Sequence, residues 1–152
     1  MGGELTIDES GRGPSFLALA MRNPGTPEQP GGLLQRIQII KGWADSDGLF
    51  HQSVYEIAGP PENGASIDPT TYTPRRQGFD SLCGVWRDPD FDPSRRAIYD
   101  ARVFENPSCR HARRLCLNTR VGEQPAAGSD PDLSTEIQER AWTSPIWITP
   151  PS

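Results

Sequence analysis

The length, charge and composition of this chain limit its possible functions before any motif is considered. Its 152 residues suffice for one domain. The net charge of −5 argues against nucleic acid as a partner, and no apolar run approaches the ~20 residues needed to span a membrane. The 15 glycines and 16 prolines predict long, turn-rich connections, whereas 4 tryptophans, 5 phenylalanines and 3 tyrosines predict a small packed core.

The first half of the chain contains an expected arm, a single strand and a hairpin. Residues 1–14 are glycine-rich and polar and are predicted to form a flexible arm, and residues 15–152 are predicted to form a single domain. The run SFLALAM at 15–21 is apolar, short and bounded by turn residues, which favours a buried strand. An Asp-Gly turn separates the β-rich segments 34–43 and 50–58, so these are predicted to form a hairpin.

The second half has fewer strand signals. Strands are expected at 81–86 and 97–104, and the long stretch 106–131 is expected to be mostly loop. The segment STEIQERA at 134–141 has the caps and composition of one or two helical turns. The apolar segment 144–149 is predicted to be the last strand, with a proline tolerated at its start.

Short strands separated by turn signals, with almost no helix, are typical of a β-sandwich. We therefore predict a mostly β protein: an immunoglobulin-like β-sandwich with long Pro/Gly-rich loops and at most one short helix. The connections are longer than is usual in a compact domain. Such loops are expected to pack on something, for example on another domain.

Three aspartates in the segment DPDFDP have the alternate spacing of a calcium-binding loop. Asp88, Asp90 and Asp92 would supply the carboxylates, but the glycine and the distal glutamate of an EF-hand are absent and two prolines stiffen the segment. A rigid acidic turn at the surface is the competing interpretation. Other metal chemistry is disfavoured, because the chain has no CxxC motif and its only histidines are His51 and His111.

Two cysteines flank the segment CRHARRLC and are candidates for a local disulfide. A bond between Cys109 and Cys116 would close a short loop, which is worth about 2–3 kcal/mol in the chain-entropy model. Two reduced thiols are the alternative, as expected in a reducing compartment. The third cysteine, Cys83, lies in the apolar string LCGVW.

The same segment is locally basic in an otherwise acidic chain. Arg110, Arg113 and Arg114 are candidates for holding a phosphate or the acidic surface of a partner. The alternative is an ordinary solvated loop that binds nothing.

Several strings in the chain together resemble one family. They are MGGEL at 1–5, RNPGTP at 22–27, LQRIQIIKGW at 34–43, VYEIAG at 54–59, DPDFDPSRRAIYDARVFENPSCR at 88–110 and IQERAWTSPIW at 137–147. They are similar to the C-terminal part of a family of large bacterial proteins of unknown function, related to the PHP (polymerase and histidinol phosphatase) metal-dependent phosphoesterases. The resemblance implies an N-terminal catalytic barrel with His, Asp and Glu metal ligands, which this chain lacks, followed by a β-sandwich tail.

The resemblance also implies a role for the chain. It would be a non-catalytic accessory β-domain that packs on, or shapes access to, the catalytic barrel, with no cofactor of its own and with divalent metal bound in the barrel. A free-standing ligand- or protein-binding β-module is the alternative. The N-terminus has no charged-then-apolar signal pattern, so the location stays open. In an exported parent the chain would be periplasmic or secreted, with Cys109 bonded to Cys116 and Cys83 free and buried; otherwise it would be cytoplasmic.

Overall fold

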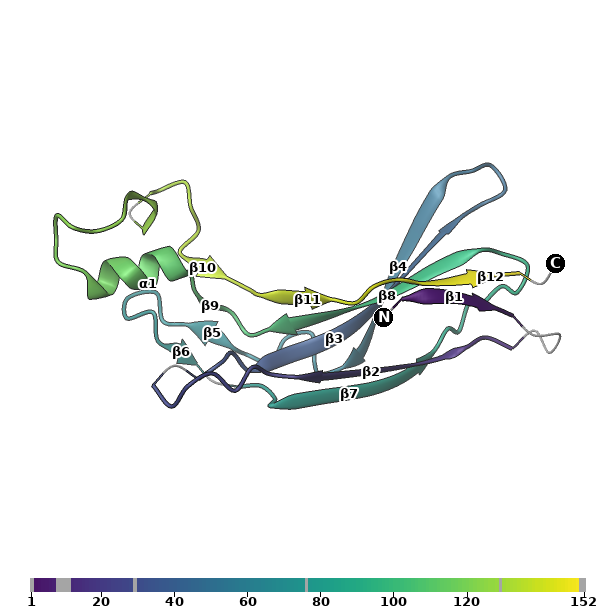
Figure 1. The fold of residues 1–152 in the computed structure, drawn as a ribbon, viewed down its shortest axis with the longest axis horizontal. Coiled ribbons are helices and arrows are strands. Elements are labelled where there is room, and N and C mark those ends of the chain that lie inside the picture. The colour runs from purple at the N-terminus through teal and green to yellow at the C-terminus, as the bar shows by residue number, and fades with distance from the viewer. Residues whose placement is uncertain (1, 8–11, 29, 76, 129, 151–152) are drawn as a thin grey trace.

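The structure is a computed structural model that describes residues 2–7, 12–28, 30–75, 77–128 and 130–150. Its strands form two packed layers, and a smaller module with the α-helix lies at one end (Figure 1). The prediction of a mostly β, sandwich-like fold with one short helix is therefore confirmed. No helix in the described ranges is long and apolar enough to cross a membrane.

The larger layer is a six-stranded sheet. Its strands in spatial order are β1 (Gly3–Thr6), β12 (Ile146–Thr149), β8 (Ala97–Glu105), β3 (Leu34–Ala44) and β4 (Phe50–Ala58), and β11 (Arg140–Trp142) also pairs with β8. The strands β1 and β12 run parallel, and the other pairings in this sheet are antiparallel. The predicted β3–β4 hairpin is confirmed. Its turn has Gly48 at φ +78°, and Asp45 Oδ1 accepts a hydrogen bond of 2.9 Å from the Leu49 amide.

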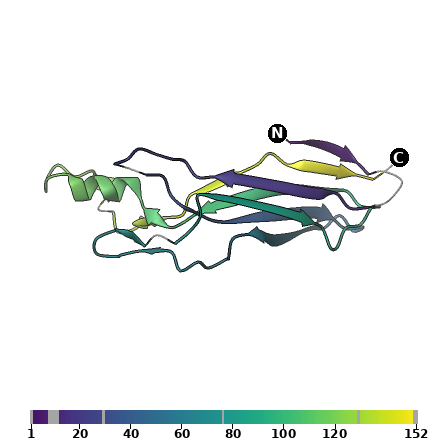
Figure 2. The ribbon, with the colours of Figure 1, turned by 90° about the horizontal axis from the view of Figure 1, so that it is seen from below.

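The smaller layer is an antiparallel pair, β2 (Ser15–Met21) and β7 (Ser81–Arg87). Contacts of β7 with β3 and β4 hold it against the larger sheet. Seen from below in Figure 2, β2 lies between β7 and β12. The module at the end of the sandwich consists of β5 (Ser66–Ile67), β6 (Pro74–Arg75), β9 (Ser108–Cys109), α1 (His111–Asn118), the 3-10 turn η1 (Ala126–Gly128) and β10 (Glu136–Ile137).

The core lies between the two layers and comes from alternate residues of the central strands. Ile37 and Ile39 of β3, Tyr99 of β8 and Ile148 of β12 are each at most 2% exposed. In the last strand Trp147 is 53% exposed, on the opposite side from Ile148. The two residues therefore lie on opposite faces of the strand, with the isoleucine in the core and the tryptophan outside.

The first residues do not stand apart from the domain. Gly3–Thr6 forms β1 alongside β12, and Ile7 is 7% exposed in the core. The predicted arm is thus wrong over this part, because backbone pairing with a strand far away in sequence orders a polar segment that has no structure of its own. Residues 8–11 of that arm lie outside the described residues.

The helix is found in a different place from the one predicted. Residues 134–141 contain the short strands β10 and β11, because the segment runs alongside β9 and β8 and pairs with them. The α-helix is His111–Asn118, within the predicted loop 106–131. The last strand also begins later than predicted, at Ile146.

Candidate functional site

Asp88 is the centre of a buried polar network and does not face solvent. Its side chain is completely buried, and its Oδ2 atom pairs with Lys41 Nζ. Tyr99 Oη donates a hydrogen bond of 2.6 Å to the same oxygen, and the Asp90 amide donates one of 2.9 Å to Asp88 Oδ1. Lys41 also donates to the Asp90 carbonyl at 2.8 Å. The network joins β3, β8 and the loop after β7 in the interior of the sandwich.

The electrostatics of this network favour an ionised Asp88. Burial alone would raise the pKa of the carboxyl, but the hydrogen bonds from Lys41, Tyr99 and the Asp90 amide outweigh it and lower the pKa below its ordinary value. Burial, with the adjacent carboxylate, raises the pKa of Tyr99 far above that of a free tyrosine. Every strong donor in the cluster is already matched to an acceptor, so the arrangement is that of a structural ion pair.

The other two aspartates of DPDFDP have separate partners. The Asp90 carboxylate accepts a hydrogen bond of 3.4 Å from Tyr55. Asp92 accepts one of 2.9 Å from the Ser94 amide and pairs with Arg95 at 3.4 Å. Among the described residues no cluster of three His, Cys, Asp or Glu side chains could hold a metal ion. The structure therefore does not assemble the three carboxylates into the calcium site that their spacing predicted.

The arginines of CRHARRLC are distributed over three environments. Arg110 Nε donates to the Ser134 carbonyl at 2.8 Å, which ties the start of α1 to the segment before β10. Arg113 donates to the Gly128 carbonyl at 3.3 Å, and its guanidinium lies 5.1 Å from the centre of the Tyr72 ring. These two side chains hold the end module together, which leaves Arg114 as the candidate of this set that lines a cavity.

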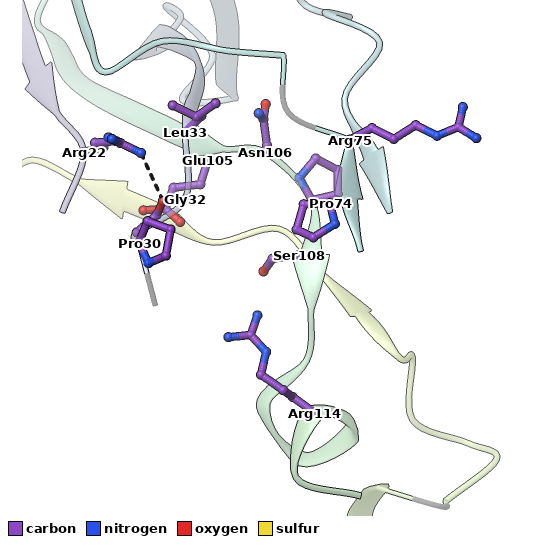
Figure 3. A pocket seen from close by; sticks show the side chains of 12 residues that line it. Arg22, Pro30, Gly32, Leu33, Pro74, Arg75, Glu105, Asn106, Ser108 and Arg114 are labelled. Carbon is purple, nitrogen blue, oxygen red and sulfur yellow. Dashed lines mark hydrogen bonds between the residues drawn. The ribbon is translucent and has the colours of Figure 1, made fainter. Parts of the chain in front are cut away.

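Arg114 lines a polar cavity of about 250 Å³ between α1 and the loops at the end of the sandwich. In Figure 3 its side chain rises from the helix towards Ser108, while Arg75 points away from the cavity. Arg22 lines the same cavity but forms an ion pair of 2.7 Å with Asp80. Glu105 lies on the opposite wall, so the cavity has charges of both signs.

The cysteines are thiols in the structure. Cys109 and Cys116 are both buried, and their sulfur atoms donate to different carbonyls, those of Arg110 and Pro125. The bond between them stays a prediction for oxidising conditions. The expectation of a buried Cys83 is wrong: Cys83 is exposed on β7, opposite Leu19, because its side chain points away from the core.

Strand β2 places Phe16 inward but has three further large apolar side chains on the outside. Leu17, Leu19 and Met21 are 70%, 68% and 77% exposed, whereas the inward positions between them hold Ala18 and Ala20. A strand with one solvated face normally places apolar residues inward and polar residues outward. The prediction of a buried strand at 15–21 is therefore correct for only one of its two faces.

The neighbouring strand extends the same surface. Val85 of β7 lies directly opposite Leu17 and is 72% exposed. We name Leu17, Leu19, Met21 and Val85 together the outer apolar face. Contiguous apolar surface of this kind marks an interaction site in soluble proteins.

An apolar groove runs beside β2, between its outer edge and the inner face of the larger sheet. It consists of two adjoining cavities of about 330 and 350 Å³, which share Leu19, Val103 and Thr143 as lining residues. Tyr99 and Ile146 form part of the floor of the first cavity.

The end of the groove near β11 is acidic. Glu105 and Glu139 both line it, and neither carboxylate has an ion-pair partner among the described residues. Burial, and then the negative charge of Glu139, raise the pKa of Glu105. Arg140 lines the same cavity, but its guanidinium lies 5.4 Å from the centre of the Phe104 ring. A positively charged group placed over the two glutamates would therefore be favoured.

Comparison with known proteins gives a family but no characterised relative. A family model described as "Protein of unknown function (DUF3604)" matches residues 1–150, so the chain belongs to this family. No curated protein matches the chain, and no solved structure matches it.

Proposed function

We propose that this member of the DUF3604 family is a non-catalytic accessory β-domain that packs on another protein domain through the outer apolar face. The observation that carries the proposal is the outward face of β2, where Leu17, Leu19 and Met21 are exposed although Ala18 and Ala20 take the inward positions between them. Burying one such large side chain is worth about 1.5–3 kcal/mol, and this is lost when the side chain stays in water. A partner that covers the face would recover it.

The resemblance described above suggests which domain the partner is. In that view the neighbour is a barrel related to the PHP metal-dependent phosphoesterases, and the β-domain supports it or shapes access to its metal site. The long β3–β4 hairpin and the module with α1 project from opposite ends of the sandwich (Figure 1) and leave the outer apolar face between them. The divalent metal would be bound by the barrel.

Site-specific photo-crosslinking tests this proposal. A photoreactive amino acid is placed at Leu19, on the outer apolar face, or at Val121, which is 93% exposed on a loop far from it in sequence. Both variants are expressed at their natural locus and irradiated in the cells that make the protein. We expect position 19 to give a crosslink that maps to one surface of a metallohydrolase barrel and position 121 to give none. Equal, weak labelling from both positions would refute the proposal.

A second candidate function is binding of a small anion in the cavity of Figure 3, as a free-standing ligand-binding module would do. It is favoured by Arg114, whose guanidinium points into the cavity near Ser108. Calorimetric titration with inorganic phosphate tests it, with Arg114→Ala as the variant and Arg120→Ala, which is exposed and does not line the cavity, as the matched control. Binding that Arg114→Ala abolishes and Arg120→Ala retains would support this function.

A further inference from the structure

The geometry points to the groove beside β2 as an acceptor site for an extended peptide strand, with alternating apolar side chains and a Lys or Arg at one end, which adds a third strand to the β2–β7 layer. This inference rests on the proposed function, because the strand would come from the protein that packs on the outer apolar face. Strand addition to β2 would be the way in which that partner is bound.

The outer edge of β2 presents unpaired backbone groups. The Arg22 amide donates to the Asp80 carbonyl at 2.9 Å, and the register places these two residues opposite each other. Hydrogen-bonded pairs alternate along an antiparallel ladder, so Ala18 and Ala20 also bond to β7. The odd-numbered residues of β2, among them Leu17 and Leu19, therefore direct N–H and C=O groups to the outer edge, where the described residues provide no strand partner.

The groove has room for one strand. It follows β2 from Phe16 to Met21, which at ~3.3 Å per residue matches an extended segment of similar length. Its floor is apolar, with Tyr99, Val103 and Ile146, so alternate side chains of the incoming strand would be buried there. The backbone of that strand would pair with β2. Recognition by strand addition combines these two contributions.

Charge and shape identify the kind of occupant. The carboxylates of Glu105 and Glu139 at the β11 end favour a basic side chain at the matching end of the strand. A second copy of the chain does not fit. The larger sheet extends past β2 through β12 and β1 (Figure 2), and the equivalent sheet of a second copy would occupy the same space. A single extended segment meets no such obstacle.

Binding of a synthetic peptide tests the inference. The probe is a fluorescent heptapeptide that alternates valine and threonine and has lysine at one end. We expect saturable binding, weakened about tenfold by Leu19→Pro, which removes an outward N–H without breaking a bond to β7. Val85→Thr, on the neighbouring strand and outside the lining of the groove, should bind the peptide within about threefold of the unchanged chain. Glu139→Gln should weaken binding of the lysine peptide but leave a glutamine version unaffected.

Amide hydrogen exchange gives an independent measurement if Leu19→Pro does not fold. In the unliganded chain the amides of Leu17, Leu19 and Met21 should exchange rapidly and those of Ala18 and Ala20 slowly; the peptide should slow the first group. Absence of peptide binding, or binding that leaves the odd-numbered amides unprotected, would overturn the inference. Val85→Thr removes part of the outer apolar face but leaves the lining of the groove unchanged. Loss of the position-19 crosslink in that variant, with peptide binding retained, therefore separates the two proposals.

Discussion

Tyr99 donates a hydrogen bond of 2.6 Å to Asp88 inside the sandwich, where the tyrosine is 1% exposed and the carboxylate is completely buried. The bond connects the central strand β8 with the loop that leaves β7. It therefore links the larger sheet to the layer with the outer apolar face. Phe16 of β2 packs on the same tyrosine with ring centres 4.6 Å apart, so apolar and polar contacts hold the layers at one point.

The ion pair between Asp88 and Lys41 should be needed for folding stability. Asp88→Asn leaves the buried ammonium group without a counter-charge, and removal of one partner of a buried pair costs about 3–5 kcal/mol. Lys41→Met should cost a similar amount. The double variant should lose clearly less than the sum, because neither charge then remains buried alone. Urea unfolding of the four proteins at pH 7 measures the coupling; strict additivity would contradict the prediction.

The same pair gives a defined pH dependence. Because the pKa of Asp88 is lowered in the folded state, its stabilising effect is present above the unfolded-state value of ~3.9 and is lost as the pH falls below it. The stability difference between the unchanged chain and Asp88→Asn should therefore be constant from pH 7 to 5 and shrink towards pH 3. A difference that stays the same at pH 3 would mean that folding does not lower the pKa of Asp88.

Asp100 should affect folding stability with the opposite pH dependence. Its Oδ1 atom is buried without a hydrogen-bond partner in the described structure, and burial raises its pKa, with a smaller opposing effect of Arg102. A carboxyl whose pKa is raised by folding destabilises the folded state as the pH rises. The loss develops between its unfolded-state pKa of ~3.9 and its higher folded-state pKa. Asp100→Asn should therefore increase the melting temperature at pH 7, and the gain should vanish near pH 3. Thermal unfolding at both pH values checks this.

The local parts of the fold were predictable from the sequence. The β3–β4 hairpin has an Asp-Gly turn and clear alternation, and both signals depend only on neighbouring residues. The strand Ala97–Glu105 was predicted to within one residue for the same reason. Strand β1 and the strands within 134–141 exist because distant segments pair with them, so local pattern could not find them.

The exposure of one face of β2 could not be predicted from the local sequence pattern either. The string SFLALAM alternates large and small residues, which shows that the strand has two different faces. Apolarity alone then suggests that both are buried, and only the arrangement of layers shows that Leu17, Leu19 and Met21 face outward. The acidic pair Glu105 and Glu139 was missed as well, because 33 intervening residues separate the two in sequence and the pairing of β11 with β8 brings them close.

The three thiols should differ in reactivity. Cys83 is exposed, whereas Cys109 and Cys116 are buried. Burial also raises the pKa of Cys109, which lowers the fraction of this thiol in the reactive thiolate form. In native reduced protein a thiol reagent should label one cysteine quickly and two only on unfolding, and Cys83→Ser should remove the fast phase. Material from an oxidising compartment, unfolded without reductant, should give one thiol if the Cys109–Cys116 bond forms and three if it does not.

The last strand offers a matched pair of substitutions that separates its structural role from a surface role. Ile148 is 1% exposed and packs in the core cluster with Tyr99, so Ile148→Ala should cost about 2–5 kcal/mol through lost burial and the cavity left behind. Trp147, the adjacent residue, is 53% exposed, and Trp147→Ala should cost less than about 1 kcal/mol in the isolated chain. Urea unfolding of both variants measures these costs. Equal losses would mean that the outer face of the sheet, where Trp147 lies, is as closely packed as the core, and the two-layer description of the domain would then have to be abandoned.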